Sequence, residues 1–149
     1  MAKKPTAADA ELCMKLYDLR REDEMRKARD FVNFQFQPKG ADDILKLMMA
    51  LGTKENAWAR QVFSYWENAA SLVLNEVVHP ALFLAWNGEM LFVYAKYGPY
   101  LKEVRQKMES PTFWSGVETV VTSSSEMKKR LGMIQKRLAK MNGQAGKKK

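Results

Sequence analysis

Apolar residues recur at helical spacing along nearly the whole chain. They return every three or four positions, whereas the strict alternation typical of a half-buried strand never persists. Residues with β-branched side chains, which favour strands, cluster only at 77–78 and 119–122. The pattern therefore predicts an all-α protein that folds as a compact multi-helix bundle.

Capping signals indicate where the first helices begin and end. Thr6 and Asp9 have the spacing of a capping box, which predicts a helix that begins just after Pro5. The apolar stripe of this helix fails at 21–23, which predicts a bend before a second helical stretch that ends near 37–40. The two stretches are expected to bury Leu12, Leu16 and Leu19, and then Met25, Ala28 and Val32.

The middle of the chain carries further start and stop signals. Residues 41–51 suit a short helix closed by Gly52, and Thr53 caps a long apolar helix that ends with Asn75 in a left-handed cap. The buried face of this long helix is expected to hold Trp58, Val62, Trp66, Ala69 and Val73. The short helices that follow are expected to begin at the prolines Pro80, Pro99 and Pro111.

The last helical segment has a heptad pattern. Ser123 and Glu126 have capping-box spacing and open a helix that is expected to close at 142–143. Apolar residues follow at steps of four, three, four and three, which is a seam of about two heptads. The seam consists of Met127, Leu131, Ile134, Leu138 and Met141. Residues 144–149 are small or cationic, and we expect them to be disordered.

The net charge of +8 is concentrated in this same segment. From residue 126 onward nine cations oppose one acid, Glu126, whereas the first 125 residues hold sixteen basic and sixteen acidic side chains. The nine cations are Lys128, Lys129, Arg130, Lys136, Arg137, Lys140, Lys147, Lys148 and Lys149. A neutral helical bundle, 1–125, is therefore expected to carry a basic helix and flexible tail, 126–149, as part of the same domain or as an appendage.

Several short motifs follow one another in a familiar order. They are 16–29 (LYDLRREDEMRKAR), Trp66 and Glu67 with the apolar residues 72–74, 97–105 (YGPYLKEVR) and the aromatic segment 113–118. In this order they resemble an uncharacterised bacterial helical domain family over about residues 14–121. The resemblance implies an all-α fold and no established activity. It also implies a membrane helix ahead of the domain in some relatives, and none precedes the motifs here.

The titratable residues give little indication of catalysis or metal binding. His79 is the only histidine, and no cysteine or acidic segment lies nearby in the sequence, so we expect a structural or capping role. Pairing of His79 with a nucleophile such as Ser71 or Cys13 has no support in the sequence. Cys13 lies among apolar residues and is interpreted as a reduced core residue. We therefore expect no catalytic residue, no metal site and no cofactor.

Two charged regions are best explained by helix structure. The acidic residues at 22–24 and 42–43 lie at expected helix starts, where carboxylates favour the N-terminal dipole. The alternating charges of 20–30 are interpreted as a solvated helix face with ion pairs at four-residue spacing, such as Glu22 with Arg26 and Asp23 with Lys27. An anionic partner bound by Arg20, Arg21, Arg26 and Arg29 is the less favoured alternative, because neighbouring acids would weaken it.

The aromatic residues leave a second alternative open. Most lie between residues 58 and 114, and they include Trp58, Trp66, Trp86 and Trp114. They could line a pocket for an apolar ligand, but aromatic side chains at helical spacing more often form an ordinary core. No glycine-rich phosphate loop and no catalytic triad accompanies them.

The C-terminal helix carries the functional hypotheses. Its seam could dock on its own bundle or pair with a second copy, and its cations could lie on an anionic surface. We favour a non-enzymatic helical interaction module that self-associates through the seam, as a homo-oligomer or with a protein partner. Sequence-nonspecific binding of nucleic acid through the basic tail is the alternative, and a ligand carrier or enzyme that uses the aromatic interior is the third hypothesis.

The expected location is the cytoplasm. The chain has a single cysteine and no apolar stretch behind its N-terminal charges, which argues against secretion. Its longest uncharged run, 77–88, is shorter than the roughly 20 apolar residues that a membrane-spanning helix needs, so we expect no membrane span.

Overall fold

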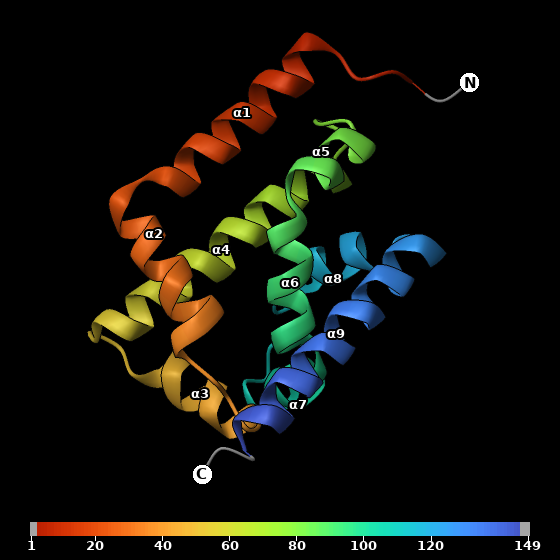
Figure 1. The fold of residues 1–149 in the computed structure, drawn as a ribbon. Helices are drawn as coiled ribbons and strands as arrows, with labels where there is room; N and C mark the ends of the chain where they lie inside the picture. Colours follow the sequence, from red (N-terminus) through yellow and green to blue (C-terminus); the bar gives the residue numbers. More distant parts are fainter. Residues whose placement is uncertain (1–2, 147–149) are drawn as a thin grey trace.

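Helix α4 (Lys54–Leu74) runs through the middle of the molecule, and the other helices pack around it (Figure 1). The computed structural model describes residues 3–146. One face of α4 is completely covered, because Ala59, Val62, Trp66 and Ala70 have no exposed surface. Helices from both halves of the chain cover it, among them α2 (Asp23–Asp30), α3 (Ala41–Met49) and α8 (Ser115–Val121).

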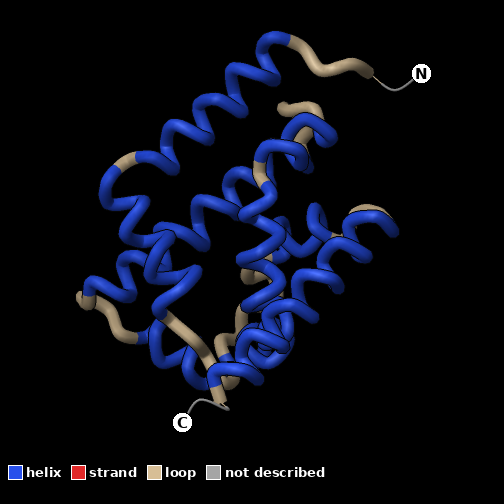
Figure 2. The backbone as a smooth tube through the Cα atoms, viewed as in Figure 1, coloured by secondary structure: helices blue, strands red, loops and turns tan. Residues whose placement is uncertain are grey.

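The described part of the chain is helical and contains no strand, which confirms the all-α bundle (Figure 2). The N-terminal half adds α1 (Ala7–Arg21) and a π-helix, η1 (Phe31–Gln35), which continues directly from α2. The remaining elements are α5 (Pro80–Trp86), α6 (Gly88–Tyr97), the 3-10 turn η2 (Gly98–Tyr100), α7 (Leu101–Lys107) and α9 (Ser125–Ala145).

The expected caps at Thr6 and Thr53 are present. The Thr6 hydroxyl accepts from the Asp9 peptide N–H at 3.3 Å, and the Asp9 carboxylate accepts from the Thr6 peptide N–H at 2.7 Å. The Thr53 hydroxyl accepts from the Asn56 peptide N–H at 3.2 Å. Both side chains satisfy donors that a helix start would otherwise leave unpaired. Gly52 has the expected left-handed φ, 85°, but it lies in the turn before Thr53, because α3 ends at Met49 and its C-cap is Ala50.

Three expected boundaries are wrong. The left-handed residue after α4 is Glu76 and not Asn75, because the chain ends this helix in a Schellman motif: the Val77 peptide N–H donates to the Leu72 oxygen at 2.8 Å. The cap of α9 is Ser124 and not Ser123, since the Ser124 hydroxyl accepts from the Met127 peptide N–H at 3.1 Å. Helix α9 also continues through 142–143 to Ala145, so residues 144–145, expected to be disordered, are helical, and 147–149 lie outside the described residues.

The helix expected to begin at Pro111 begins at Ser115. Helix α7 closes in a second Schellman motif, in which the Ser110 peptide N–H donates to the Arg105 oxygen at 3.0 Å and Glu109 has a φ of 53°. The chain then turns through Trp114, whose φ of 57° is left-handed, before α8 starts. This conformation is costly for a bulky side chain and persists only where the surroundings fix it.

The buried face of α1 is more polar than expected. Leu19 is 49% exposed, while Asp9 and Arg20 are buried together with Cys13 and Leu16. Both charged residues have partners at the ends of α5, its N-cap His79 and its C-cap Asn87: the Asp9 carboxylate accepts from the His79 peptide N–H at 2.8 Å, and the Arg20 guanidinium donates to the Asn87 side-chain oxygen. Hydrogen bonds thus place these two charged residues inside, where the apolar pattern alone predicted a leucine.

The charges of 20–30 form the expected solvated face only in part. Arg29 makes a bidentate ion pair with Glu89 of α6, and its guanidinium also donates to the Arg20 carbonyl at 3.0 Å. The exposed residues form surface pairs at three-residue spacing, Arg26 with Asp23 at 2.9 Å and Lys27 with Glu24 at 2.6 Å, and not at the expected four-residue spacing. The Glu22 carboxylate is engaged instead as the cap of α2.

Lys96 of α6 closes the end of the π-helix η1. Its ammonium group donates to the carbonyl oxygens of Val32 at 2.9 Å, Asn33 at 3.1 Å and Phe36. The hydroxyl of Tyr97 donates to the same Val32 oxygen at 2.6 Å. These donors satisfy carbonyls that a helix end leaves free. Burial lowers the pKa of Lys96 to about 8.

Replacing Lys96 with Met should lower the free energy of unfolding by roughly 1–3 kcal/mol at neutral pH, because three carbonyls lose their donor. The pH dependence should also change. The folded protein releases the Lys96 proton near pH 8 and the unfolded chain near pH 10.5, so the unfolded state binds more protons between these values and wild-type stability rises with pH. Urea unfolding from about pH 7 to about pH 9.5 should therefore give a growing difference between wild type and K96M. If the difference in the free energy of unfolding between wild type and K96M stays constant over this interval, the pKa of Lys96 is not lowered by burial.

Candidate functional site

The heptad seam of α9 faces the protein's own bundle over most of its length. Met127 and Leu131 are buried, and Ile134 and Leu138 are half-buried against the core. The helix lies beside α6 and α8 (Figure 1). Met141, at the C-terminal end of the seam, is 65% exposed. Four of the five seam residues are therefore docked intramolecularly in this structure.

The second half of α9 is less tightly seated than the first. Leu138 and Ala139 line a cavity of about 350 Å³ together with Ala95 and Lys96 of α6. The exposed polar end of α9 thus lies over the Lys96 cap of the π-helix. Docking of the seam fixes which side of α9 faces the solvent.

The cations of α9 lie on the side that docking leaves in the solvent. Six of the nine fall within the described residues, and all six are exposed: Lys128, Lys129, Arg130, Lys136, Arg137 and Lys140. At 3.6 residues per turn, Lys129, Lys136 and Lys140 fall within about 40° of one another, opposite the seam, and Arg130 and Arg137 both lie about 80–100° to one side of them. We call these five residues the basic face. The expected anion-binding residues Lys147, Lys148 and Lys149 lie outside the described residues.

No carboxylate neutralises the basic face. Within residues 3–146, none of the ion pairs involves a cation of α9. The helix itself holds one acid, Glu126, in its first turn. The basic face is therefore an extended stripe of positive charge, about 16 Å long from Lys129 to Lys140 at the rise of an α-helix.

The four tryptophans do not line one common pocket. Trp66 has no exposed surface and packs at the centre of the core, whereas Trp86 is 41% exposed. Trp58 is half-buried beneath the Lys54 ammonium, 4.7 Å from its ring centre. Trp114 is buried and lines a cavity of about 530 Å³. Most of the aromatic residues therefore form ordinary core.

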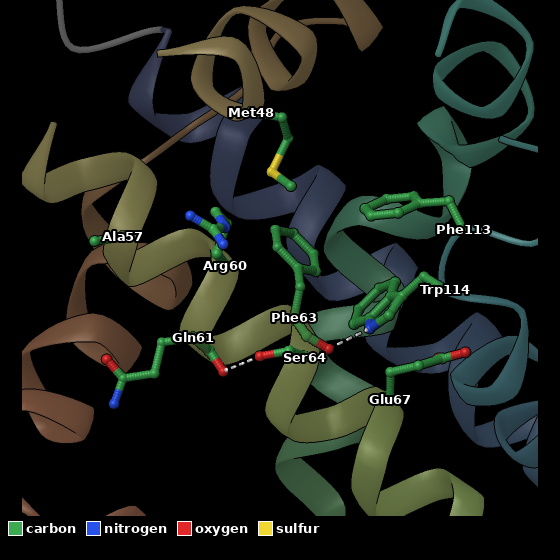
Figure 3. Close-up of a pocket in the computed structure, with 9 residues that line it drawn as sticks. All are labelled: Met48, Ala57, Arg60, Gln61, Phe63, Ser64, Glu67, Phe113 and Trp114. Carbon is green, nitrogen blue, oxygen red and sulfur yellow. Dashed lines mark hydrogen bonds between the residues drawn. The ribbon is translucent and has the colours of Figure 1, made fainter. Parts of the chain in front are cut away.

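The Trp114 cavity lies between α4, the end of α3 and the loop before α8 (Figure 3). Its volume is about 530 Å³. Residues at spacings of three and four along α4 form one wall, and Met48, Phe113 and Trp114 close the other sides. The α4 residues are Ala57, Arg60, Gln61, Phe63, Ser64 and Glu67. Arg60 and Met48 were not among the candidate residues predicted from the sequence. The helical spacing of the α4 positions could have indicated that Arg60 shares a face with Ser64 and Glu67.

Two contacts hold the loop of this cavity in place. The Trp114 indole N–H donates to the Phe63 carbonyl at 3.1 Å, and its ring meets the Phe63 ring edge-on with centres 4.9 Å apart. The Glu67 carboxylate accepts from the peptide N–H groups of Gly116 at 2.8 Å and Val117 at 3.0 Å, and so caps α8. Together they fix the left-handed backbone at Trp114.

The remaining titratable candidates are engaged in structural contacts. His79 lies at the start of α5, and its Nε2 is 2.6 Å from the Lys3 carbonyl oxygen. Hydrogen bonds from Thr6, followed by that from the His79 peptide, lower the pKa of Asp9. Cys13 is buried, and desolvation raises the pKa of its thiol. Within residues 3–146, no group of three or more potential metal ligands comes together.

Comparison with known families identifies the body of the chain. A family model described as a domain of unknown function, DUF4760, matches residues 5–124. The chain belongs to the DUF4760 family. The resemblance drawn from the sequence motifs is thereby confirmed as a match to an uncharacterised helical domain. The DUF4760 match ends one residue before α9 begins at Ser125.

Neither the comparison with curated proteins nor the comparison with solved structures finds a match to this chain. No helix among residues 3–146 is long and apolar enough to span a membrane.

Two glycine substitutions should have opposite effects on the free energy of unfolding, one at the Glu67 cap of α8 and one on α9. A Cβ at Gly116 would lie 2.8 Å from the Glu67 carboxylate, so Gly116→Ala should displace the cap and lower the free energy of unfolding by about 1 kcal/mol. A Cβ at Gly132 meets nothing within 4 Å, so Gly132→Ala should stabilise α9 by about 0.5–1 kcal/mol through helix propensity. Urea unfolding of both variants measures the two changes. Stabilisation by Gly116→Ala would show that Glu67 does not cap α8.

Proposed function

We propose that this DUF4760 protein is a non-enzymatic helical module that binds nucleic acid, without sequence preference, through the basic face of α9. The observation that carries the proposal is the orientation of this helix. Docking of the seam turns Lys129, Lys136 and Lys140 away from the bundle, and no described acid pairs with them. A fixed row of unpaired cations is the arrangement that attracts a polyanion.

The distribution of charge over the whole chain supports a polyanionic partner. The first 125 residues are neutral, so the positive potential is confined to the C-terminal segment and not spread over the body. Cations that contact phosphates release condensed counterions, which makes this kind of binding strong at low salt and weak at high salt. No base-reading motif accompanies the basic face, and the contact is therefore to the phosphate backbone.

A lipid surface is the less favoured anionic partner. Helices that lie in a membrane interface carry Trp, Phe or Leu on their apolar side, and that side of α9 is docked on the bundle. The outer side offers Met133, which is 48% exposed, and no aromatic residue. We include a cytoplasmic location in the proposal, and the buried, unpaired Cys13 supports a reducing compartment.

The protein should shift random duplex DNA at about 50 mM salt. If the five cations of the basic face engage phosphates, the slope of log affinity against log salt should be about −4 to −5. Replacing Lys129, Lys136 and Lys140 with Gln should flatten this slope by roughly 2.7, because each lost phosphate contact removes about 0.9. Electrophoretic shift assays over a range of salt concentrations measure both slopes.

The matched control removes three cations from the body. Lys15, Lys46 and Lys102 are exposed on α1, α3 and α7, and their replacement with Gln changes the net charge by the same amount. This variant should keep most of the wild-type affinity. Absence of a shift by the wild type, or equal losses in the two triple variants, would reject the basic face as the binding surface. Binding to anionic vesicles in preference to DNA would assign the face to lipid.

Self-association through the seam stays a prediction. Because the seam is docked on its own bundle, α9 would have to leave the bundle before it could pair with a second copy. Ile134→Asp should destabilise the protein by roughly 1–3 kcal/mol if the seam stays docked, whereas Met141→Asp, at an exposed position, should have little effect. Sedimentation at high protein concentration measures the oligomeric state directly. A dimer that both substitutions dissociate would establish pairing of the seam, and a wild-type monomer would exclude it.

A further inference from the structure

We infer that the Trp114 cavity is a binding site for a small organic anion with a flat apolar body, such as an aryl carboxylate. This site is separate from the basic face of α9 and does not depend on the proposed function. The cavity opens between α4, the end of α3 and the loop before α8, and its volume of about 530 Å³ is in the range of small-molecule sites.

The apolar part of the cavity suits an aromatic ring. The side chains of Met48, Phe63, Phe113 and Trp114 gather on one side (Figure 3). Phe63 and Trp114 are buried beneath the surface, while Met48 and Phe113 are half-buried at the opening. Ring faces and a thioether sulfur make favourable contacts with a flat aromatic ligand. A bound ring would cover apolar surface that now faces the solvent.

The polar part of the cavity selects a negative charge. Arg60 lies on α4 beside these side chains, and among the described residues no carboxylate is within 4.0 Å of its guanidinium. Glu67, the acid of the cavity wall, is held by the Gly116 and Val117 peptide N–H groups. The carboxylate of Glu67 is thus directed toward α8, and the cationic group of the cavity wall is Arg60. A guanidinium group binds a carboxylate through two parallel hydrogen bonds.

The other polar groups do not compete for the anion. The Ser64 hydroxyl donates to the Gln61 carbonyl at 3.3 Å, and the Gln61 side chain points away from the aromatic residues (Figure 3). The walls are already ordered, because Trp114 is fixed by the Phe63 carbonyl and α8 by Glu67. A preformed site has little side-chain entropy to lose on binding. A ligand of naphthoate size should therefore bind with a Kd of roughly 0.1–1 mM.

The test compares 2-naphthoate with its neutral analogue 2-naphthamide on the full chain. Titration is followed by NMR through the indole N–H signals, with Trp114 as reporter and the core residue Trp66 as internal reference. We expect 2-naphthoate to shift the Trp114 signal in a saturable way and 2-naphthamide to bind about tenfold more weakly, which is the effect of losing one charge-assisted pair. Absence of a saturable shift with 2-naphthoate would overturn the proposal.

Two variants separate the roles of charge and shape. Arg60→Gln removes the anchor at an exposed position and should weaken 2-naphthoate about tenfold while leaving 2-naphthamide unchanged. Arg21→Gln, the control, removes an exposed arginine from α1 and should change neither affinity. Equal affinity of the acid and the amide for the wild type, or equal losses in the two variants, would show that Arg60 does not bind the carboxylate. These measurements concern the cavity alone, so their interpretation is the same whether or not the protein binds DNA.

Discussion

The burial of helix α4 is the constraint on which the rest of the structure depends. Its apolar residues between Ala59 and Ala70, both small and large, form a stripe along one face, and these side chains are buried. A helix of 21 residues with such a face has to be covered along its whole length, and no single neighbour is long enough to do so. The chain covers it with several short helices, which explains their number and their tight turns. The side of α4 that carries Arg60 and Glu67 is only partly covered, by the end of α3 and the start of α8, and forms a cavity wall.

Polar contacts from α4 then position the elements that carry the two candidate sites. Glu67 caps α8, and the Phe63 carbonyl holds Trp114 in its left-handed conformation. With α8 fixed beside α6, the two helices provide the surface on which α9 docks. The seam of α9 can be buried in one orientation only, and this orientation directs its cations to the solvent. The basic face and the Trp114 cavity thus depend on the same short helix.

The boundary of the DUF4760 match falls where the charge changes. Residues 5–124 match the family and belong to the neutral body, and α9 with its cations follows. In the proposed function the shared domain supplies a rigid neutral base and the added helix supplies the charge. The half-buried pair of Arg29 and Glu89 contributes to this rigidity, because it joins α2 to α6 across 60 residues of sequence.

The sequence by itself determined the all-α class, the capped starts at Thr6 and Thr53 and the confinement of charge to the C-terminal segment. These properties follow from local spacing and composition, which act within a few residues. Tertiary structure alone decided that Arg20 is buried and Arg29 half-buried, because their partners Asn87 and Glu89 lie 67 and 60 residues away. It also decided that the seam docks, that Trp114 is left-handed and that Arg60 joins Met48 and Phe113 at one cavity. Each of these depends on contacts between distant segments, and helical periodicity shows which residues share a face without showing what that face meets.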